Sequence, residues 1–507
     1  MMSSASLPAN RWLVLVAVMM AFLPAVLDMT ILHVAVPTLT QSLNASGTEV
    51  LWIMDIYPLL MAGLLVPMGT LADRVGNRVI LLIGLVIFGV ASAWAAFAQS
   101  SAMLIAARVL LALGGSMIMP CVLGLIRKTF EDEGERAMAL GLWGMVGAAG
   151  AAVGPLVGGA LLEHFWWGSV FLINVPVMLL VAPACHVLLP RVERTTSGKW
   201  AIGQALPLIA GMISIVYGVK AGFGGGQPPP IIVLVVVFGI AALTLFVRQQ
   251  LRSSEPMLDL SLLSHPAIVA GLIMAIVASG TLAGVELTLA QELQYVLGKT
   301  PLQAGIFMIP IMAAAAVGGP VASHLSNRFG LRLVTTVSLL ISAGALVSLA
   351  RSDFHDPGFL VPFALAILGL TLSIGLTASS IAIMGSVDGR EGGAAGSLEA
   401  TGHELGTGLG ITLFGVFMSS VFSRAIELPA SQSQAFAEQA SRTIGDAFIV
   451  ASELPGEQGA ALIEAGKAAF TQTHAVLLTT AALVIAALAV VVFLTLAGYR
   501  GLSRAHH

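Results

Sequence analysis

Apolar residues fall into long blocks along the chain, separated by short breaks rich in charged residues, glycine or proline. A helix needs about 20 predominantly apolar residues to cross a bilayer, and each block reaches or approaches that length. The pattern therefore predicts an all-α integral membrane protein with fourteen spanning helices. These lie near residues 12–35, 50–70, 79–98, 102–125, 136–161, 169–189, 201–222, 230–247, 267–294, 301–322, 333–350, 358–385, 391–421 and 471–497.

Two polar breaks divide these spans into groups of six, two and six. We expect a six-helix bundle over 1–190, a two-helix insert with flanking cytoplasmic linkers over 191–265, and a second six-helix bundle over 266–507. A long polar segment at about 423–470 precedes the last span. Its residues 435–451 could form a short surface helix, and we expect the segment to be a solvated cap.

Composition agrees with a protein whose surroundings are mostly hydrocarbon. The chain is 57% hydrophobic and 10% charged, with a mean hydropathy of +0.95, whereas soluble domains carry about 25% charged residues. The net charge of -3 gives no basic surface for nucleic acid. Cys121 and Cys185 form neither a disulfide framework nor a spaced metal site. We expect no metal and no cofactor.

The distribution of basic residues predicts the orientation. With a cytoplasmic N-terminus, 16 Lys and Arg fall inside and 6 outside, with Arg108 within a span, and the positive-inside rule then places both termini in the cytoplasm. The inside group is Arg11, Arg74, Arg78, Arg127, Lys128, Arg136, Arg191, Arg194, Lys199, Arg248, Arg252, Arg328, Arg332, Arg390, Arg500 and Arg504. The outside group is Lys220, Lys299, Arg351, Arg424, Arg442 and Lys467.

Five acidic residues lie inside apolar spans and are the candidate proton- or cation-binding groups: Asp28, Asp55, Glu286, Glu399 and Glu404. A carboxylate at membrane depth costs several kcal/mol, so such residues mark ion or substrate paths. A carboxyl group can carry a proton or face a bound cation, so the two occupancies compete at one site. This chemistry suits a transporter that exchanges protons for a cationic small molecule.

The positions of these acids suggest how they are arranged. Asp28 and Asp55 fall in the outer portions of adjacent antiparallel helices and could approach one another. Glu292, nearer the interface than Glu286, is expected at the surface. Glu404 points about 140° away from Glu399 on a helix, so we expect one of the two to pack between helices. His33 and His403 could relay protons, but a packing role is the better expectation for each.

A loop between the second and third spans carries the first family motif. Residues 69–78 read G-T-L-A-D-R-V-G-N-R, in which Gly69, Asp73, Arg74, Gly76 and Arg78 hold the motif positions. A connection this tight needs glycine, and Asp73 is placed to cap the next helix or pair with an arginine. The motif resembles the loop signature of the major facilitator superfamily, where it is regarded as a conformational latch. The second-half copy, at 323–330, has Asn327 in place of the Asp.

The fifth span carries Gly150, Gly154, Pro155 and Gly158 at a spacing that leaves a groove on one helix face. This resembles the G-x3-G-P-x2-G-G motif of antiporters in the superfamily. The first-helix pattern around Asp28 and the segment 166–176 resemble the fourteen-helix drug:proton antiporter-2 family. Residues 52–57, 161–165 and 403–406 resemble its SmvA-like branch, named for methyl viologen resistance.

The resemblance implies a major facilitator fold that works by alternating access in the bacterial inner membrane. It implies a proton-coupled exporter of lipophilic and quaternary cations, not an enzyme, and we expect a monomer. Arg108 begins the family's fourth-helix motif, although Leu111 and Ala112 replace its Gln and Gly, and is a candidate for coupling proton movement to conformation. Candidate cavity walls, where aromatic faces attract quaternary ammonium, are Trp52, Tyr57, Trp143, Phe307 and Met308.

Two other transport functions stay open from the residues alone. The protein could export a natural organic cation such as a polyamine, or it could be a proton:solute symporter. An ATP-driven pump is not supported, because Leu293 stands where a phosphate-binding loop ending at Thr300 needs its first glycine. A zinc protease is not supported either, because Thr407 replaces the second histidine of the motif that begins at His403.

Overall fold

The computed structural model describes residues 11–189, 200–224, 227–387, 392–429 and 434–498, and throughout these ranges the regular structure is helical. Fourteen helices in this part of the chain are long and apolar enough to cross a membrane, which confirms the predicted fold class. Six of the basic residues used for orientation lie outside the described residues: Arg191, Arg194, Lys199, Arg390, Arg500 and Arg504.

The first nine helices form two groups, which we name the N-half and the insert. The N-half is α1 (Arg11–Leu43), α2 (Gly47–Val75), α3 (Asn77–Ala96), α4 (Ser101–Thr129), α5 (Glu133–His164), α6 (Ser169–Leu172) and α7 (Asn174–Leu188). The insert is α8 (Ile202–Gly224) and α9 (Pro229–Arg252). Helices α6 and α7 together make the sixth span.

The remaining elements form the C-half. They are η1 (Leu260–Ser264), α10 (Pro266–Gln291), the π-helical turn η2 (Glu292–Val296), α11 (Pro301–Phe307), α12 (Ile309–Phe329), α13 (Leu331–Ala350), α14 (Leu360–Met384), α15 (Gly392–Ala425), α16 (Gln434–Ala440), α17 (Ile444–Glu453), α18 (Gly456–Thr495) and η3 (Leu496–Gly498).

Local signals in the sequence explain where several helices begin. Ser46 and Glu49 form a capping box at the start of α2, and Thr300 and Gln303 form another at α11. Each box satisfies backbone N–H groups that a helix end otherwise leaves free. These caps fix the loops that join α1 to α2 and α10 to α11.

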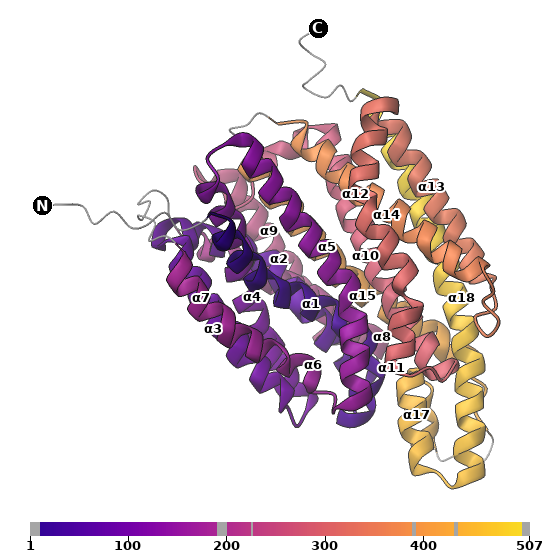
Figure 1. Ribbon diagram of the computed structural model, residues 1–507. Helices are drawn as coiled ribbons and strands as arrows, with labels where there is room; N and C mark the ends of the chain where they lie inside the picture. The colour runs from indigo at the N-terminus through magenta and orange to yellow at the C-terminus, as the bar shows by residue number, and fades with distance from the viewer. Residues whose placement is uncertain (1–10, 190–199, 225–226, 388–391, 430–433, 499–507) are drawn as a thin grey trace, which may run out of the picture.

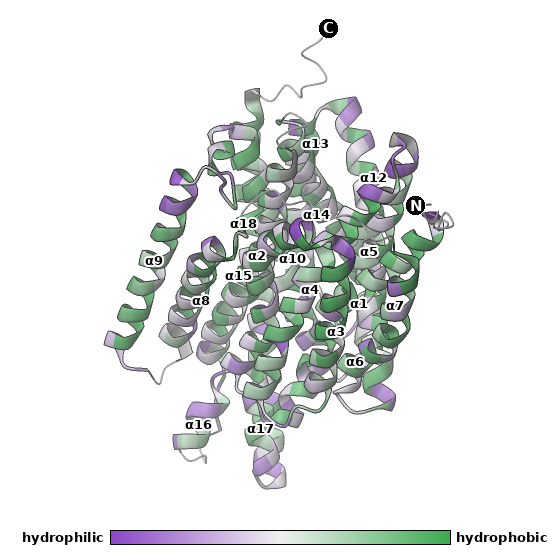
Figure 2. Ribbon diagram, turned by 90° about the vertical axis from the view of Figure 1, so that its left-hand side faces the viewer, coloured by the Kyte–Doolittle hydropathy of each residue, from purple (hydrophilic) through white to green (hydrophobic). Residues whose placement is uncertain are grey.

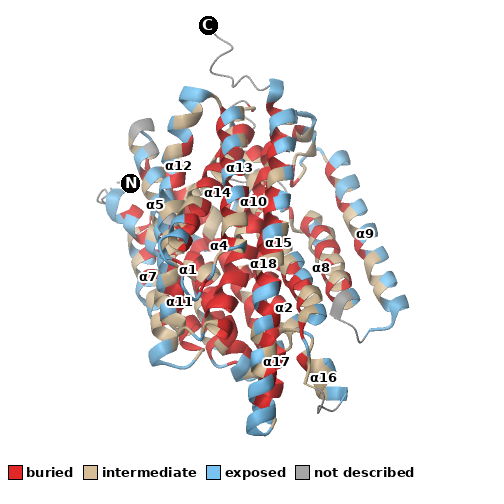
Figure 3. Cartoon of the chain, turned by 90° about the vertical axis from the view of Figure 1, so that its right-hand side faces the viewer, coloured by how far each residue is buried: buried red, intermediate tan, exposed pale blue. Residues whose placement is uncertain are grey.

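Helix packing separates a buried centre from a lipid-facing rim. The N-half and the C-half each bury an apolar core of their own, and Figure 3 shows the buried residues concentrated along the middle of the bundle. The insert lies at the side: α8 packs on α2 and α15, whereas α9 packs mainly on α8. Figure 2 shows α9 as a largely hydrophobic helix at the edge of the molecule.

The two halves meet toward one end of the bundle, which we name the α17 end (Figure 1). There α1 contacts α17, α5 contacts α11, and α2 contacts α15. A Cβ atom added at Gly159 of α5 would lie 2.6 Å from the Leu302 Cα. Toward the other end of α5, a Cβ added at Gly141 or Gly144 would meet nothing within 4 Å. The described contacts therefore close the α17 end and leave Gly141 and Gly144 of α5 without a close neighbour.

The polar segment before the last span differs from the sequence expectation. Residues 435–451 form α16 and α17, which are separated at 441–443, where Thr443 caps α17. The last helix begins at Gly456, well before the apolar block at 471. Apolar residues of α17 pack against the early part of α18, so α18 extends beyond the span as a scaffold for α17.

Candidate functional site

The first candidate group is an ion pair between α1 and α4 inside the N-half. The Arg108 Nη1 donates to Asp28 Oδ2, and both side chains are almost completely buried. Arg108 Nε also donates to the Ile53 carbonyl oxygen at 3.1 Å, and its guanidinium lies 4.7 Å from the centre of the Tyr57 ring. Arg108 of α4 therefore contacts both α1 and α2, and the Asp28 carboxylate neutralises its charge.

The second group joins all three parts of the molecule around Asp55. Lys220 Nζ of α8 lies 2.6 Å from Asp55 Oδ2, and neither side chain is more than 1% exposed. The Thr412 hydroxyl of α15 donates to the same carboxylate oxygen at 2.5 Å. The Lys220 ammonium also lies 3.6 Å from the centre of the Trp52 ring. An acid of the N-half is thus held by a cation from the insert and a hydroxyl from the C-half.

The third group crosses directly between the halves. His33 Nε2 of α1 lies 3.7 Å from Glu286 Oε2 of α10. At the next residue of α1, the Val34 carbonyl oxygen accepts a hydrogen bond of 2.9 Å from Gln294 of the π-helical turn. His33 was expected only to pack between helices, but its imidazole lies opposite the Glu286 carboxylate.

The two acids of α15 have different surroundings. Glu404 is buried, and its carboxyl lies close enough to Tyr57 to interact with it electrostatically. Glu399 is half-buried and interacts with Ser380 of α14. Glu404 is thus the α15 acid that faces the N-half.

The structure gives Asp28 and Asp55 separate cationic partners, Arg108 and Lys220, in place of one shared site. The reason lies in the helix arrangement: α2 packs extensively on α4 and α15 but touches α1 at only a few positions. Asp28 of α1 therefore contacts α4, whereas Asp55 of α2 contacts α8 and α15.

The latch motif forms the connection between α2 and α3. Gly76 is the single residue between these helices and has φ 112°, a value that favours glycine. Gly330 joins α12 to α13 with φ 86°, so the second half repeats the geometry. Asp73 was expected to cap the next helix or to pair with an arginine. The first alternative is wrong, because Gly76 is the N-cap of α3 and no side chain there makes a cap hydrogen bond. Arg78 instead donates to the His186 carbonyl oxygen of α7.

The glycine motif of α5 packs two helices at once. Cβ atoms added at Gly150, Gly154 or Gly158 would contact α1 residues from Leu23 to Ile31. On the C-half side, a Cβ added at Gly305 of α11 would lie 2.6 Å from the Pro155 carbonyl oxygen. The small residues thus allow close backbone approach, which is the physical role predicted for them.

The five candidate wall residues have different environments. Trp52 lines a cavity, described below. Tyr57 and Met308 are completely buried, so neither forms a cavity wall here: Tyr57 packs on Arg108 and Met308 in the C-half core. Trp143 packs on Phe22 of α1, and Phe307 on Phe354.

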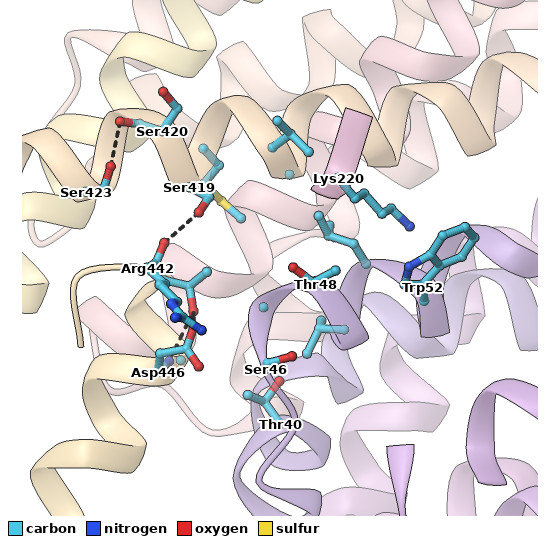
Figure 4. Close-up of a pocket in the computed structure, with 18 of the residues that line it drawn as sticks. Thr40, Ser46, Thr48, Trp52, Lys220, Ser419, Ser420, Ser423, Arg442 and Asp446 are labelled. Carbon is cyan, nitrogen blue, oxygen red and sulfur yellow. Dashed lines mark hydrogen bonds between the residues drawn. The ribbon is translucent and has the colours of Figure 1, made fainter. Parts of the chain in front are cut away.

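A cavity of about 480 Å³ lies at the α17 end, where residues of the N-half, the insert and the C-half meet. Figure 4 shows Trp52 and Lys220 on one side of it and Arg442 and Asp446 on another. Burial raises the pKa of Asp446 above its ordinary value, although hydrogen bonds from Thr443 and from the Gly47 backbone oppose the shift. The cavity is therefore bordered by the three basic residues Lys220, Arg424 and Arg442 and by the buried acid Asp446.

The sequence pattern predicted the wrong position for two ionisable residues, Lys220 and Glu292. Lys220 was counted with the outside loops, because it lies two residues from the end of its predicted span, yet it is buried against Asp55. Glu292 was expected at the surface but is 2% exposed, because it begins the π-helical turn and faces Thr471 of α18. Both lie inside apolar blocks, which is the signal that singled out the other acids.

The chain is similar to known transport proteins along almost its whole length. It is 44% identical over 488 residues to the methyl viologen resistance protein SmvA of Salmonella typhimurium, covering 96% of this chain and 99% of that protein. It is 34% identical over 492 residues to the multidrug efflux pump LfrA of Mycolicibacterium smegmatis, covering 97% of each.

The fold and the family model agree with these relatives. A solved bacterial homolog of the human lysosomal transporter Spinster, in an inward-facing and unoccupied conformation, superposes with a TM-score of 0.67 at 19% identity over 96% of each chain. The model of the Major Facilitator Superfamily matches residues 18–411. The chain therefore belongs to the Major Facilitator Superfamily, a family of membrane transporters of small molecules.

Proposed function

We propose that this protein is a proton-coupled antiporter that exports lipophilic and quaternary cations, viologens and cationic biocides among them, across the bacterial inner membrane. Supporting this proposal, relatives covering nearly the whole chain are described as a methyl viologen resistance protein and a multidrug efflux pump. The observation that carries it is the set of buried carboxylates at helix contacts: Asp28, Asp55, Glu286 and Glu404.

The proposed orientation follows the distribution of positive charge. Both termini face the cytoplasm, and the α17 end faces the outside, where basic residues are few. The contacts that close the α17 end then correspond to an inward-facing arrangement, in which cargo enters from the cytoplasm. The protein works as a secondary active transporter and as a monomer.

Exchange follows from competition at the carboxylates. A cation bound near an ionised carboxyl group is released when a proton neutralises that group, because the attraction between the two charges is lost. Asp55 and Glu286 contact residues of the opposite half, Thr412 and His33. A change in their charge therefore changes the contacts that hold the halves together, which links proton movement to rocking of the bundles.

Asp28 and Arg108 have a different part in this scheme. Their ion pair lies within the N-half, so a proton on Asp28 would free Arg108 to change its contacts with α2. Glu399, nearer the cytoplasmic end of α15, is proposed as the acid by which protons leave.

The proposal is tested by proton release from inside-out vesicles with an acidic lumen. Adding methyl viologen or another quaternary cation should alkalinise the lumen of vesicles that carry the wild-type protein, because cargo entering the lumen drives protons out. Asp28→Asn, which cannot exchange a proton, should reduce this signal at least about tenfold. Glu427→Gln, in the polar outer segment, is the matched control and should retain it.

A signal that survives in Asp28→Asn would keep the antiporter and move the exchanged proton to Asp55 or Glu286. A wild-type response to a polyamine but to no lipophilic cation would replace the proposed cargo. Proton movement in the same direction as the cargo would contradict antiport.

A further inference from the structure

The insert supplies a positive charge to the interior of the transporter. Lys220 is 2% exposed and is the one buried lysine in the part of the chain that the structure describes. Its ammonium contacts the Asp55 carboxylate at 2.6 Å and lies 3.6 Å from the Trp52 ring centre. A carboxylate and an aromatic face are the two groups that bind organic cations in proteins.

We infer that Lys220 is a tethered cation that occupies the Asp55–Trp52 site and must be displaced by cationic cargo. This inference rests on the proposed function, since it assigns a cargo site to a transporter of cations. Lys220 is thus the residue that sets how strongly a cation must bind in order to enter this site.

The first support is the composition of the site. Thr412 already donates to Asp55 Oδ2, while Asp55 Oδ1 has no hydrogen-bond partner among the described residues. Lys220 Nζ likewise has no hydrogen-bond partner there apart from its ion pair, so two of its three N–H donors stay unused. An ion pair whose hydrogen-bonding capacity is left unfilled gains less from burial than a fully bonded one. Such a pair is suited to exchange its cation.

The second support is position. Lys220 and Trp52 line the 480 Å³ cavity at the α17 end, whereas Asp55 lies beyond them and is completely buried. Lys220 contacts Asp55 and also lines this cavity, so its side chain lies between the two. The cavity offers space into which the ammonium can move when cargo takes its place.

The third support is the way the insert is attached. Helix α8 packs on both α2 and α15, so Lys220 reaches Asp55 at a contact between the halves. Its partner helix α9 is largely exposed and packs mainly on α8. The insert therefore meets the two halves mainly through α8, the helix that carries Lys220.

Removing the ammonium should improve cation binding. In detergent solution, Lys220→Met and Lys220→Gln should each bind methyl viologen about tenfold more tightly than wild type, the size of one charge-assisted contact. The gain should disappear in Asp55→Asn/Lys220→Met. Lys467→Met, which removes a lysine of the outer segment, should stay close to wild type.

A second measurement uses the unaltered protein. Lys220 should react faster with a small amine-modifying reagent when methyl viologen is present, because displacement moves the ammonium toward the cavity. Lys467, in α18 before the apolar block at 471, should react at the same rate with and without methyl viologen.

Unchanged or weaker binding by Lys220→Met and Lys220→Gln would overturn the inference, as would an increase that persists in the double variant. Reaction of Lys220 that is unchanged or slowed by methyl viologen would also overturn it. These outcomes are separate from failure of the proposed function, which would appear as the absence of cation-driven proton release from wild-type vesicles.

Discussion

Single ionisable residues in the interior differ mainly in which helices supply their partners. Arg108 and Asp28 both belong to the N-half, so their ion pair can persist while the halves move. Asp55 is held from the insert and the C-half, and Glu286 faces His33 across the two halves. The latter two acids can therefore sense the relative position of the halves directly.

Replacement of Arg108 should test whether the Asp28 ion pair is a structural element. Arg108→Leu leaves the Asp28 carboxylate buried without a cation, and loss of one partner of a buried pair costs about 3–5 kcal/mol. Asp28→Asn/Arg108→Leu removes both charges and should lose less free energy of unfolding than Arg108→Leu alone. Unfolding in mixed detergent micelles, followed by tryptophan fluorescence, measures both values. Equal losses in the single and double variants would show that the two charges are not coupled.

The sequence could identify most of these acids but not their partners. A carboxylate in an apolar block is visible in a hydropathy pattern, as Asp28, Asp55 and Glu286 were. The neighbour across a helix contact depends on helix rotation and crossing, which the pattern does not contain. Lys220 was therefore counted with the basic residues outside the membrane, although its ammonium contacts Asp55.

Whole helices were predicted more accurately than their irregularities. Fourteen apolar blocks correspond to fourteen long helices, because hydrocarbon leaves no other way to satisfy the backbone of a spanning segment in this chain. The break at Met308 between α11 and α12, the π-helical turn after Gln291 and the division of α16 from α17 were not predicted. The π-helical turn accompanies a tertiary contact, that of Gln294 with Val34, which the hydropathy pattern does not contain.

Two glycines of one helix allow a matched test of the contact between α5 and α11. In Gly159→Ala, the new methyl group would lie 2.6 Å from the Leu302 Cα, so the closed arrangement of the α17 end must shift. Overpacking costs about 1–3 kcal/mol, and we expect export of a cationic dye to fall at least about tenfold. In Gly144→Ala the methyl group meets nothing within 4 Å, and export should stay within about twofold of wild type. Similar export by the two variants would show that this contact is not needed for transport.

At the scale of the whole molecule, the polar segment before the last span is part of the closure between the halves. Helix α17 packs on α18 of the C-half and also contacts α1. Its Asp446 interacts with the Gly47 backbone at the start of α2. The Gln41 side chain of α1 donates to the Gly445 carbonyl oxygen at 3.4 Å. A segment expected to be a solvated cap is therefore placed where the halves must separate if cargo is to leave outward.

A disulfide between α1 and α17 should stop transport reversibly. A Cβ added at Gly445 lies 3.0 Å from Thr40 Cγ2, so Thr40→Cys/Gly445→Cys, with Cys121 and Cys185 replaced by Ala, should cross-link on oxidation. The bond would hold the α17 end closed, and we expect dye export to be lost when the pair is oxidised and restored by a reductant. The control pair is Ala447→Cys/Gly466→Cys, because a Cβ added at Gly466 lies 3.6 Å from the Ala447 Cβ within the C-half. This pair should cross-link without loss of export, since α17 and α18 move together. Continued export by the oxidised Thr40/Gly445 pair would show that cargo leaves without separating α17 from α1.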